Sequence, residues 1–206
     1  MQISKLIHSR RTLAFLFVFL AEILVLGFLA SGSYLPLFHH RQAEPSLIGG
    51  PFELEDLNGV KMTERDLAGK YTLLYFGYAE DAAFTPTELR VAAVAMNLLG
   101  PERSRIKTYF VSLDPARDTR EKLKAYLKDI SPELSGLTGT LQQVSAMAKA
   151  YHVYFRKIPD PQNPENYSMD YSPLFYLMGP DEKFVKPFAY TTDAKGLAEG
   201  LKMVLE

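Results

Sequence analysis

The side chains that could do chemistry in this chain carry oxygen or imidazole groups, because the sequence contains no cysteine. Without a thiolate the chain can form no disulfide, no Cys-x-x-Cys redox centre and no thiolate metal site. Three acidic residues, Glu80, Asp81 and Asp170, could converge to hold a hard cation such as Ca²⁺ or Mg²⁺. Their spacing matches no calcium-binding loop, so solvated loop carboxylates are the simpler interpretation.

Two further groups of residues could bind a metal or orient a reacting group. The adjacent pair His39–His40 could bind Cu²⁺ or Zn²⁺ weakly, although two neighbours on a tether seldom form a closed site. His152 is expected at the start of a strand, with ordinary exposure. Asp114, Arg117 and Asp118 could orient a catalytic group, but an ion pair that closes a loop before a helix is the favoured interpretation.

The elements that must position these residues alternate between strands and helices from residue 52 onward, which predicts an α/β domain. The run 71–78 is apolar throughout, as expected of a central strand buried on both faces. Asn58–Gly59 predicts a hairpin turn, and Asp193 is expected to cap the last helix. We predict strands over 52–54, 60–62, 71–78, 106–113, 152–158, 174–178 and 184–188, and helices over 87–99, 119–127 and 140–151 and after residue 193.

An apolar run near the N-terminus predicts a membrane anchor. We assign residues 1–11 to a basic cytoplasmic end, 12–31 to a transmembrane helix, 32–47 to a tether and 48–206 to an outer domain. A cleaved signal peptide and a twin-arginine export signal remain alternatives. The net charge of −1 makes nucleic acid an unexpected partner.

Six short segments of the outer domain occur in the order found in a known family. They read Gly49-Gly50-Pro51-Phe52-Glu53-Leu54, Tyr75-Phe76-Gly77-Tyr78, Val111 to Thr119, Leu137-Thr138-Gly139-Thr140, Ala148-Lys149-Ala150-Tyr151 and Tyr176-Leu177-Met178-Gly179-Pro180. Together they resemble the SCO/SenC family of copper chaperones. The resemblance implies a thioredoxin-like fold, a mixed sheet flanked by helices, on an inner-membrane anchor that faces the periplasm or the mitochondrial intermembrane space. It also implies work in assembling the copper centre of cytochrome oxidase.

The resemblance locates three copper ligands, and this sequence replaces all of them. The family uses a Cys-x-x-x-Cys-Pro motif after the Phe-Gly-Tyr strand and a distant His in an Asp-His-Ser segment. The two cysteine positions fall on Asp81 and Thr85, and the histidine position falls on Tyr171. A carboxylate, a hydroxyl and a phenol cannot reproduce a soft, sulfur-rich site for Cu(I). We therefore expect no metal and no cofactor at these degenerate positions.

The replacements predict a structural role for the second position. Thr85, Pro86 and Glu88 have the spacing of a helix N-terminus, with threonine as the N-cap, proline next and glutamate reaching back to the N-cap amide. Ser172–Pro173 precedes a strand, as the cis-proline of thioredoxin folds does, although cis bonds are uncommon before proline.

These observations leave four hypotheses for function. The first is a redox-silent binding or assembly factor that contacts a respiratory oxidase subunit or a copper-competent SCO-like protein, with Tyr78, Phe84 and Asp170 as possible docking residues. The second is a metal carrier that uses carboxylate and imidazole ligands. The third is a drifted paralogue without metal function. The fourth, a thiol-dependent reductase or peroxidase, is disfavoured because no thiolate exists, so we expect no enzyme.

Overall fold

The computed structural model describes residues 48–163 and 166–206, and these residues lie in one compact unit. The predicted anchor over 12–31, the tether over 32–47 and the pair His39–His40 lie outside the described residues. Within the described part, no helix combines the length and the apolar character needed to cross a membrane.

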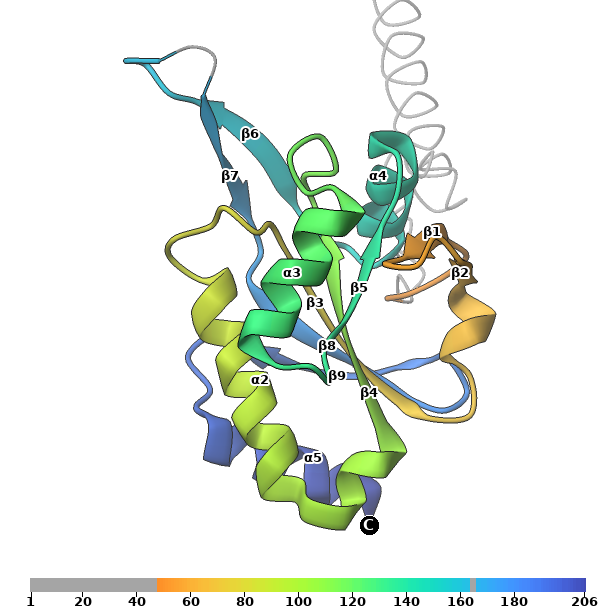
Figure 1. The fold of residues 1–206 in the computed structure, drawn as a ribbon. Helices are drawn as coiled ribbons and strands as arrows, with labels where there is room; N and C mark the ends of the chain where they lie inside the picture. Colours follow the sequence, from red (N-terminus) through yellow and green to blue (C-terminus); the bar gives the residue numbers. More distant parts are fainter. Residues whose placement is uncertain (1–47, 164–165) are drawn as a thin grey trace, which may run out of the picture. The chain divides into compact units, whose positions relative to one another are not determined.

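Seven strands form one mixed sheet in the order β2-β1-β5-β4-β3-β8-β9 (Figure 1). The central strands β3, β4 and β5 are parallel, whereas every pairing outside them is antiparallel. Two further strands, β6 and β7, form a separate antiparallel hairpin. The strands are β1 (Glu53–Asp56), β2 (Lys61–Thr63), β3 (Tyr71–Gly77), β4 (Ile106–Ser112), β5 (Ser135–Thr138), β6 (Phe155–Pro159), β7 (Tyr167–Tyr171), β8 (Leu174–Met178) and β9 (Phe184–Ala189).

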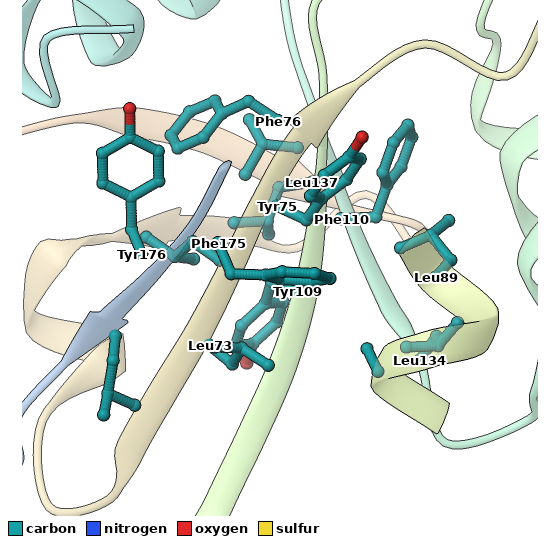
Figure 2. Packing of buried hydrophobic residues seen from close by; sticks show 14 of the residues in the cluster. Leu73, Tyr75, Phe76, Leu89, Tyr109, Phe110, Leu134, Leu137, Phe175 and Tyr176 are labelled. Atoms are coloured by element: carbon teal, nitrogen blue, oxygen red, sulfur yellow. The ribbon is translucent and has the colours of Figure 1, made fainter. Parts of the chain in front are cut away.

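Helices lie on both faces of this sheet, as the alternating pattern predicts. They are α2 (Thr85–Leu99), α3 (Arg120–Ile130), α4 (Leu141–Ala150) and α5 (Ala194–Leu205), with 3₁₀ turns at Glu64–Leu67 and Gly100–Arg105. Neighbouring residues of β3 point to opposite faces. Tyr75 stacks on Phe110, which also contacts Tyr126 of α3, whereas Phe76 packs against Tyr151 at the end of α4 (Figure 2). The predicted mixed sheet flanked by helices is confirmed.

The hairpin formed by β6 and β7 differs from the prediction at its start. His152 does not begin a strand, since its φ of 56° places it in the left-handed region after α4. The amide of Val153 donates to the carbonyl of Ala148 at 2.8 Å, which closes the end of the helix. The chain therefore needs a turn before β6 can begin at Phe155.

Two short strands were not predicted, and one backbone expectation is wrong. β5 and β7 were missed because β5 has only four residues, one of them Gly136, and β7 carries four polar or tyrosine side chains. The peptide bonds of the described residues are all trans, so Ser172–Pro173 is not the cis bond that the likeness to thioredoxin folds suggested.

Candidate functional site

The three degenerate ligand positions come together in one buried hydrogen-bonded cluster. Asp81 lies in the loop after β3, Thr85 begins α2 and Tyr171 ends β7. The Tyr171 hydroxyl donates to Asp81 Oδ2 at 2.5 Å, and the Thr85 hydroxyl donates to the same oxygen at 3.1 Å. Tyr171 Oη also lies 3.2 Å from Thr85 Oγ1. The three residues are only 5%, 0% and 9% exposed, so the cluster is shielded from water.

Asp81, and not Thr85, caps the start of α2. Its carboxylate accepts hydrogen bonds from the backbone amides of Ala83, Phe84 and Thr85, at 2.8, 3.2 and 2.9 Å. The N-cap residue is Phe84, which makes no side-chain cap, and Thr85 is already helical. The predicted capping box is therefore wrong. A carboxylate four residues earlier reaches the free amides first, and the threonine hydroxyl turns to Asp81 and Tyr171 instead.

The charges within the cluster are divided between a carboxylate and a neutral phenol. Burial alone would raise the pKa of Asp81, but hydrogen bonds from Tyr171 and three backbone amides outweigh burial and lower that pKa. Burial, the neighbouring Tyr75 and the bond to Asp81 all raise the pKa of Tyr171. Tyr75 Oη lies 3.1 Å from Tyr171 Oη and extends the network into the core. Asp81 is thus the anion that the surrounding donors stabilise.

Glu88 lies one turn into α2 and does not reach back to the helix start. The residue is 3% exposed, and its Oε2 atom has no hydrogen-bond partner among the described residues. Burial raises the pKa of Glu88 to about 7. Sequence reasoning treated this residue as a capping group. Glu88 lies on the apolar face of the helix with Leu89, Ala92 and Met96. This position was the sequence signal that its side chain would be buried.

The buried carboxyl of Glu88 predicts a pH dependence of stability. Its pKa is about 7 in the folded chain, above the ordinary glutamate value of 4.5. The folded state therefore holds more protons between these values, and the free energy of unfolding should fall by about 2–3 kcal/mol as pH rises through that window. Urea unfolding of the parent and Glu88→Gln at several pH values measures this. The decrease in unfolding free energy with rising pH should be absent in Glu88→Gln. It should persist in Glu199→Gln, a control at an exposed helical position. An identical pH profile for Glu88→Gln would contradict the assignment.

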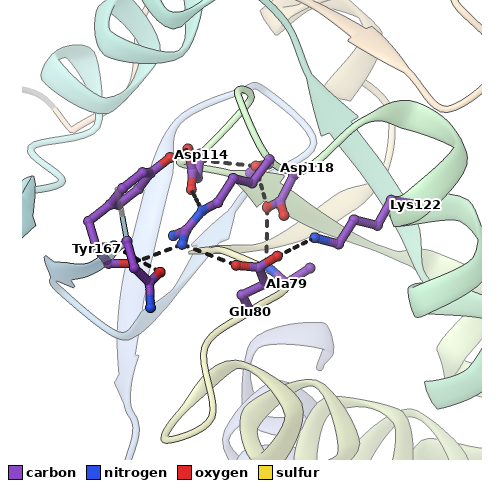
Figure 3. Close-up of polar contacts among 9 residues, drawn as sticks. Ala79, Glu80, Asp114, Asp118, Lys122 and Tyr167 are labelled. Atoms are coloured by element: carbon purple, nitrogen blue, oxygen red, sulfur yellow. Dashed lines mark hydrogen bonds and ion pairs between the residues drawn. The ribbon is translucent and has the colours of Figure 1, made fainter. Parts of the chain in front are cut away.

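A second polar network lies beside the cluster and is centred on Arg117 (Figure 3). Its guanidinium pairs with Asp114, forms an ion pair with Glu80 Oε2 at 3.0 Å and donates to the carbonyl oxygen of Tyr167 at 2.8 Å. Lys122 approaches Glu80 from the other side at 2.6 Å. The network joins the loop after β3, the loop after β4 and strand β7. The ion-pair interpretation of Asp114 and Arg117 is confirmed.

Asp118 holds the loop that leads from β3 to the cluster. Its Oδ2 atom accepts from the amide of Ala79 at 3.0 Å and from the hydroxyl of Ser112 at 2.7 Å (Figure 3). Thr119, the next residue, is the N-cap of α3 and accepts from the amide of Lys122. Both observations agree with a loop-closing role before a capped helix.

The acidic residues suggested as ligands for a hard cation do not share a site. Glu80 is bound to Lys122 and Arg117, and Asp170 pairs with Arg156 at 3.1 Å. Across residues 48–163 and 166–206, no three His, Cys, Asp or Glu side chains gather closely enough to hold an ion. The described acidic residues therefore give no support to hard-metal binding.

The suggested docking residues differ in how accessible they are. Tyr78 is 6% exposed and packs edge-on against Tyr171, so the expectation that it is an exposed anchor is wrong. Its position at the end of a buried strand carries it into the core. Phe84 is 37% exposed and meets Tyr190 edge to face. Asp170 is exposed and accepts from Tyr154 and Arg156.

A cleft of about 580 Å³ opens beside the cluster. One wall is the loop over residues 78–83, and the other is the hairpin end, with Ile158–Pro161 and Asn166–Ser168. Tyr171 and Arg117 each join the two walls. Tyr171 belongs to β7 of the hairpin and donates to Asp81 in the loop, and Arg117 contacts Glu80 in the loop and the carbonyl oxygen of Tyr167 in β7. The cluster therefore occupies the place where two segments meet, and its hydrogen bonds hold them together.

The cluster cannot hold Cu(I) in the way that the resemblance implies for relatives. Asp81 already accepts five hydrogen bonds, and Tyr171 keeps its proton. No cysteine thiolate exists anywhere in the chain. Hard, mutually satisfied oxygen atoms do not fit a soft monovalent ion.

Comparisons with known proteins agree with the fold and with the six segments. A family model described as SCO1/SenC matches residues 40–206. The mitochondrial protein SCO1 of Saccharomyces cerevisiae is 36% identical over 185 residues, which cover 82% of this chain and 62% of that protein. The SCO2-like protein of Rickettsia felis is 34% identical over 155 residues, which cover 75% of this chain and 76% of that protein. The chain spans about half to three fifths of the length of the yeast relatives.

Solved structures extend the similarity to three dimensions. Yeast Sco1 superposes with a TM-score of 0.71 and 37% identity, covering 78% of this chain and 98% of that one. Copper-bound ScoI of Bradyrhizobium japonicum gives a TM-score of 0.70 and 36% identity, covering 76% and 98%. The described domain is thus a thioredoxin-like mixed sheet flanked by helices.

Proposed function

Because this chain belongs to the SCO1/SenC family, we propose that it is a redox-silent accessory protein that acts by binding during cytochrome c oxidase biogenesis. One observation carries the proposal. The scaffold is retained, while the three ligand positions are occupied by an aspartate, a threonine and a tyrosine that bind one another. A protein built in this way can present a surface but cannot exchange thiols or carry Cu(I) on these residues.

The partner that best fits this function is a respiratory oxidase subunit or a copper-competent SCO-like protein. Relatives solved with copper bound share the fold of this chain. An inner-membrane anchor over residues 12–31, with the domain in the periplasm or the intermembrane space, would hold the chain beside such a partner. Mitochondrial relatives are consistent with this location. We propose no catalytic role, since thiol chemistry would need a cysteine.

The surface beside the cluster is the part of the domain that we expect to bind the partner. Phe84 and Tyr190 are exposed aromatic residues in edge-to-face contact, and Asp81 fixes the loop that presents Phe84. Rigid aromatic anchors are frequent at the energetic centre of protein interfaces. The cluster would then act as a support for this loop.

Affinity purification tests this proposal. The tagged full-length chain, extracted from its native membrane, should recover an oxidase subunit or a copper-competent SCO-like protein. Phe84→Asp should lower the recovery by about tenfold, because it places a charge at an apolar contact worth more than about 1 kcal/mol. Val94→Asp, at another exposed apolar position of α2, is the matched control and should leave recovery unchanged. Recovery of no respiratory component by the parent chain would refute the proposal.

The metal-carrier alternative gains nothing from the three acidic residues suggested as ligands, because Glu80 and Asp170 are paired with cations and Asp81 with the helix start. Equilibrium dialysis with elemental analysis distinguishes it from the binding function. Retention of stoichiometric Cu(I) by the parent chain would favour the carrier.

A further inference from the structure

A hollow of about 410 Å³ lies at the start of β5, away from the cluster. β1 pairs with β5 only at Leu137 and Thr138. Ser135 and Gly136 therefore have ladder partners on the β4 side alone. The turn that follows β1 and the second half of α3 form the sides of the hollow. Its volume falls in the range of small-molecule sites.

The walls of the hollow are mainly apolar, with one polar group at a buried position. Leu57, Met62, Leu127 and Leu134 contribute to the walls. Tyr109 also lines it and is 7% exposed, and its hydroxyl makes no hydrogen bond with the described residues. The hydroxyl oxygen is not among the buried polar atoms that lack a partner, so it stays accessible to solvent. It is therefore free to donate a hydrogen bond to a ligand in the hollow.

The mouth of the hollow is positively charged. Arg120, Lys124 and Lys128 are spaced four residues apart and share one side of α3. Arg120 is paired with Glu55 at 2.9 Å, and Lys124 donates to Asn58 Oδ1 at 3.1 Å. Lys128, which lines the hollow with Lys124, has no ion pair or hydrogen bond within the described part of the chain.

One acidic residue, Asp56, lies at the mouth beside the two lysines, so the charged residues that line the hollow keep a net positive charge. Asp56 Oδ1 accepts from the amides of Asn58 and Val60, both at 2.8 Å, and its Oδ2 accepts from the Asn58 side chain. Backbone bonds therefore engage the carboxylate within its own turn. The ammonium groups of Lys124 and Lys128 each keep N–H donors that can bind a ligand.

We propose that this hollow binds a small amphipathic carboxylate. The apolar body of the ligand lies against Leu57, Leu127 and Leu134, and its carboxylate accepts from Lys124, Lys128 and the hydroxyl of Tyr109. An apolar wall disfavours a fully hydrated anion such as phosphate, and the two lysines disfavour an amine of the same shape. The site is separate from the partner-binding surface and does not depend on the proposed function.

Calorimetry of the full-length chain in lipid nanodiscs tests the site with 4-phenylbutyrate as the probe. At about 0.3 kcal/mol for each heavy atom, this twelve-atom acid should bind with a dissociation constant of about 1 mM. The matched alcohol, 4-phenylbutanol, and the amine, 4-phenylbutylamine, should bind about tenfold more weakly or not at all. Empty nanodiscs correct for partition of each probe into lipid.

Three variants distinguish the proposed site from general apolar binding. Lys128→Glu should weaken binding of the acid by about tenfold, and Tyr109→Phe by about fivefold, since each removes a donor to the carboxylate. Lys149→Glu, at the matched position in the last turn of α4, should have no effect. Lys128 is exposed, so its replacement leaves the fold intact. Equal affinity for acid and alcohol, or unchanged binding in Lys128→Glu, would overturn the proposal.

Discussion

The triple variant Asp81→Cys, Thr85→Cys, Tyr171→His is expected to retain Cu(I) at one ion per chain, whereas the parent chain retains none. The three positions already lie within hydrogen-bond distance of one another. The scaffold therefore brings the side chains together whichever residues occupy them. Two thiolates and an imidazole are the ligand types that a soft monovalent ion prefers. Anaerobic loading, desalting and elemental analysis measure the retained copper.

A matched variant separates the effect of sulfur from the effect of geometry. Asp81→Ser, Thr85→Ser, Tyr171→His has nearly the same side-chain shapes but offers hydroxyls in place of thiolates, so it should retain no Cu(I). Circular dichroism shows whether each variant is folded. A folded cysteine-containing variant that fails to bind copper would mean that the segments around Asp81 and Tyr171 no longer have the geometry of a ligand site.

Asp81→Ala is expected to lower the free energy of unfolding by about 3–5 kcal/mol, the largest stability effect that we predict for a single substitution. The Asp81 carboxylate accepts from three backbone amides and from the hydroxyls of Thr85 and Tyr171. Alanine removes this acceptor from all five donors, three of which belong to the buried residues Thr85 and Tyr171. Urea unfolding at pH 7 provides the measurement.

The pH dependence and a control identify the cause of this loss. The pKa of Asp81 in the folded chain lies below the ordinary aspartate value of 3.8. Its contribution is complete well above pH 3.8 and is lost as pH falls through the folded-state pKa, so the deficit of Asp81→Ala should shrink in acid. Asp170→Ala, which removes an exposed carboxylate paired with Arg156, should cost less than about 1 kcal/mol. Equal losses for the two variants would contradict the role of Asp81.

The comparison of Asp81 with Thr85 shows where local sequence patterns mislead. Threonine, proline and glutamate had the spacing of a capping box, yet the observed cap is the carboxylate of Asp81. Local spacing identifies which groups could reach the first helix amides. Local spacing says nothing about the hydroxyl of Tyr171, which belongs to a strand 86 residues away and lies within hydrogen-bond distance of the threonine hydroxyl.

The sequence by itself determined the chemistry that this protein lacks and much of its framework. The absence of cysteine excludes a thiolate site in any fold, because ligand softness is a property of the side chain. The apolar run of β3, the hairpin at Asn58–Gly59 and the pair of Asp114 with Arg117 also followed from local patterns, since each involves residues close in the chain.

Only the tertiary structure decided what the replaced residues do. Asp81 and Tyr171 are 90 positions apart, and no local rule states that a hydrogen bond of 2.5 Å joins them. The burial of Tyr78 and Glu88 depends in the same way on which elements cover them. Contacts between distant segments depend on how the sheet and helices pack. That packing turns three separate substitutions into one hydrogen-bonded cluster.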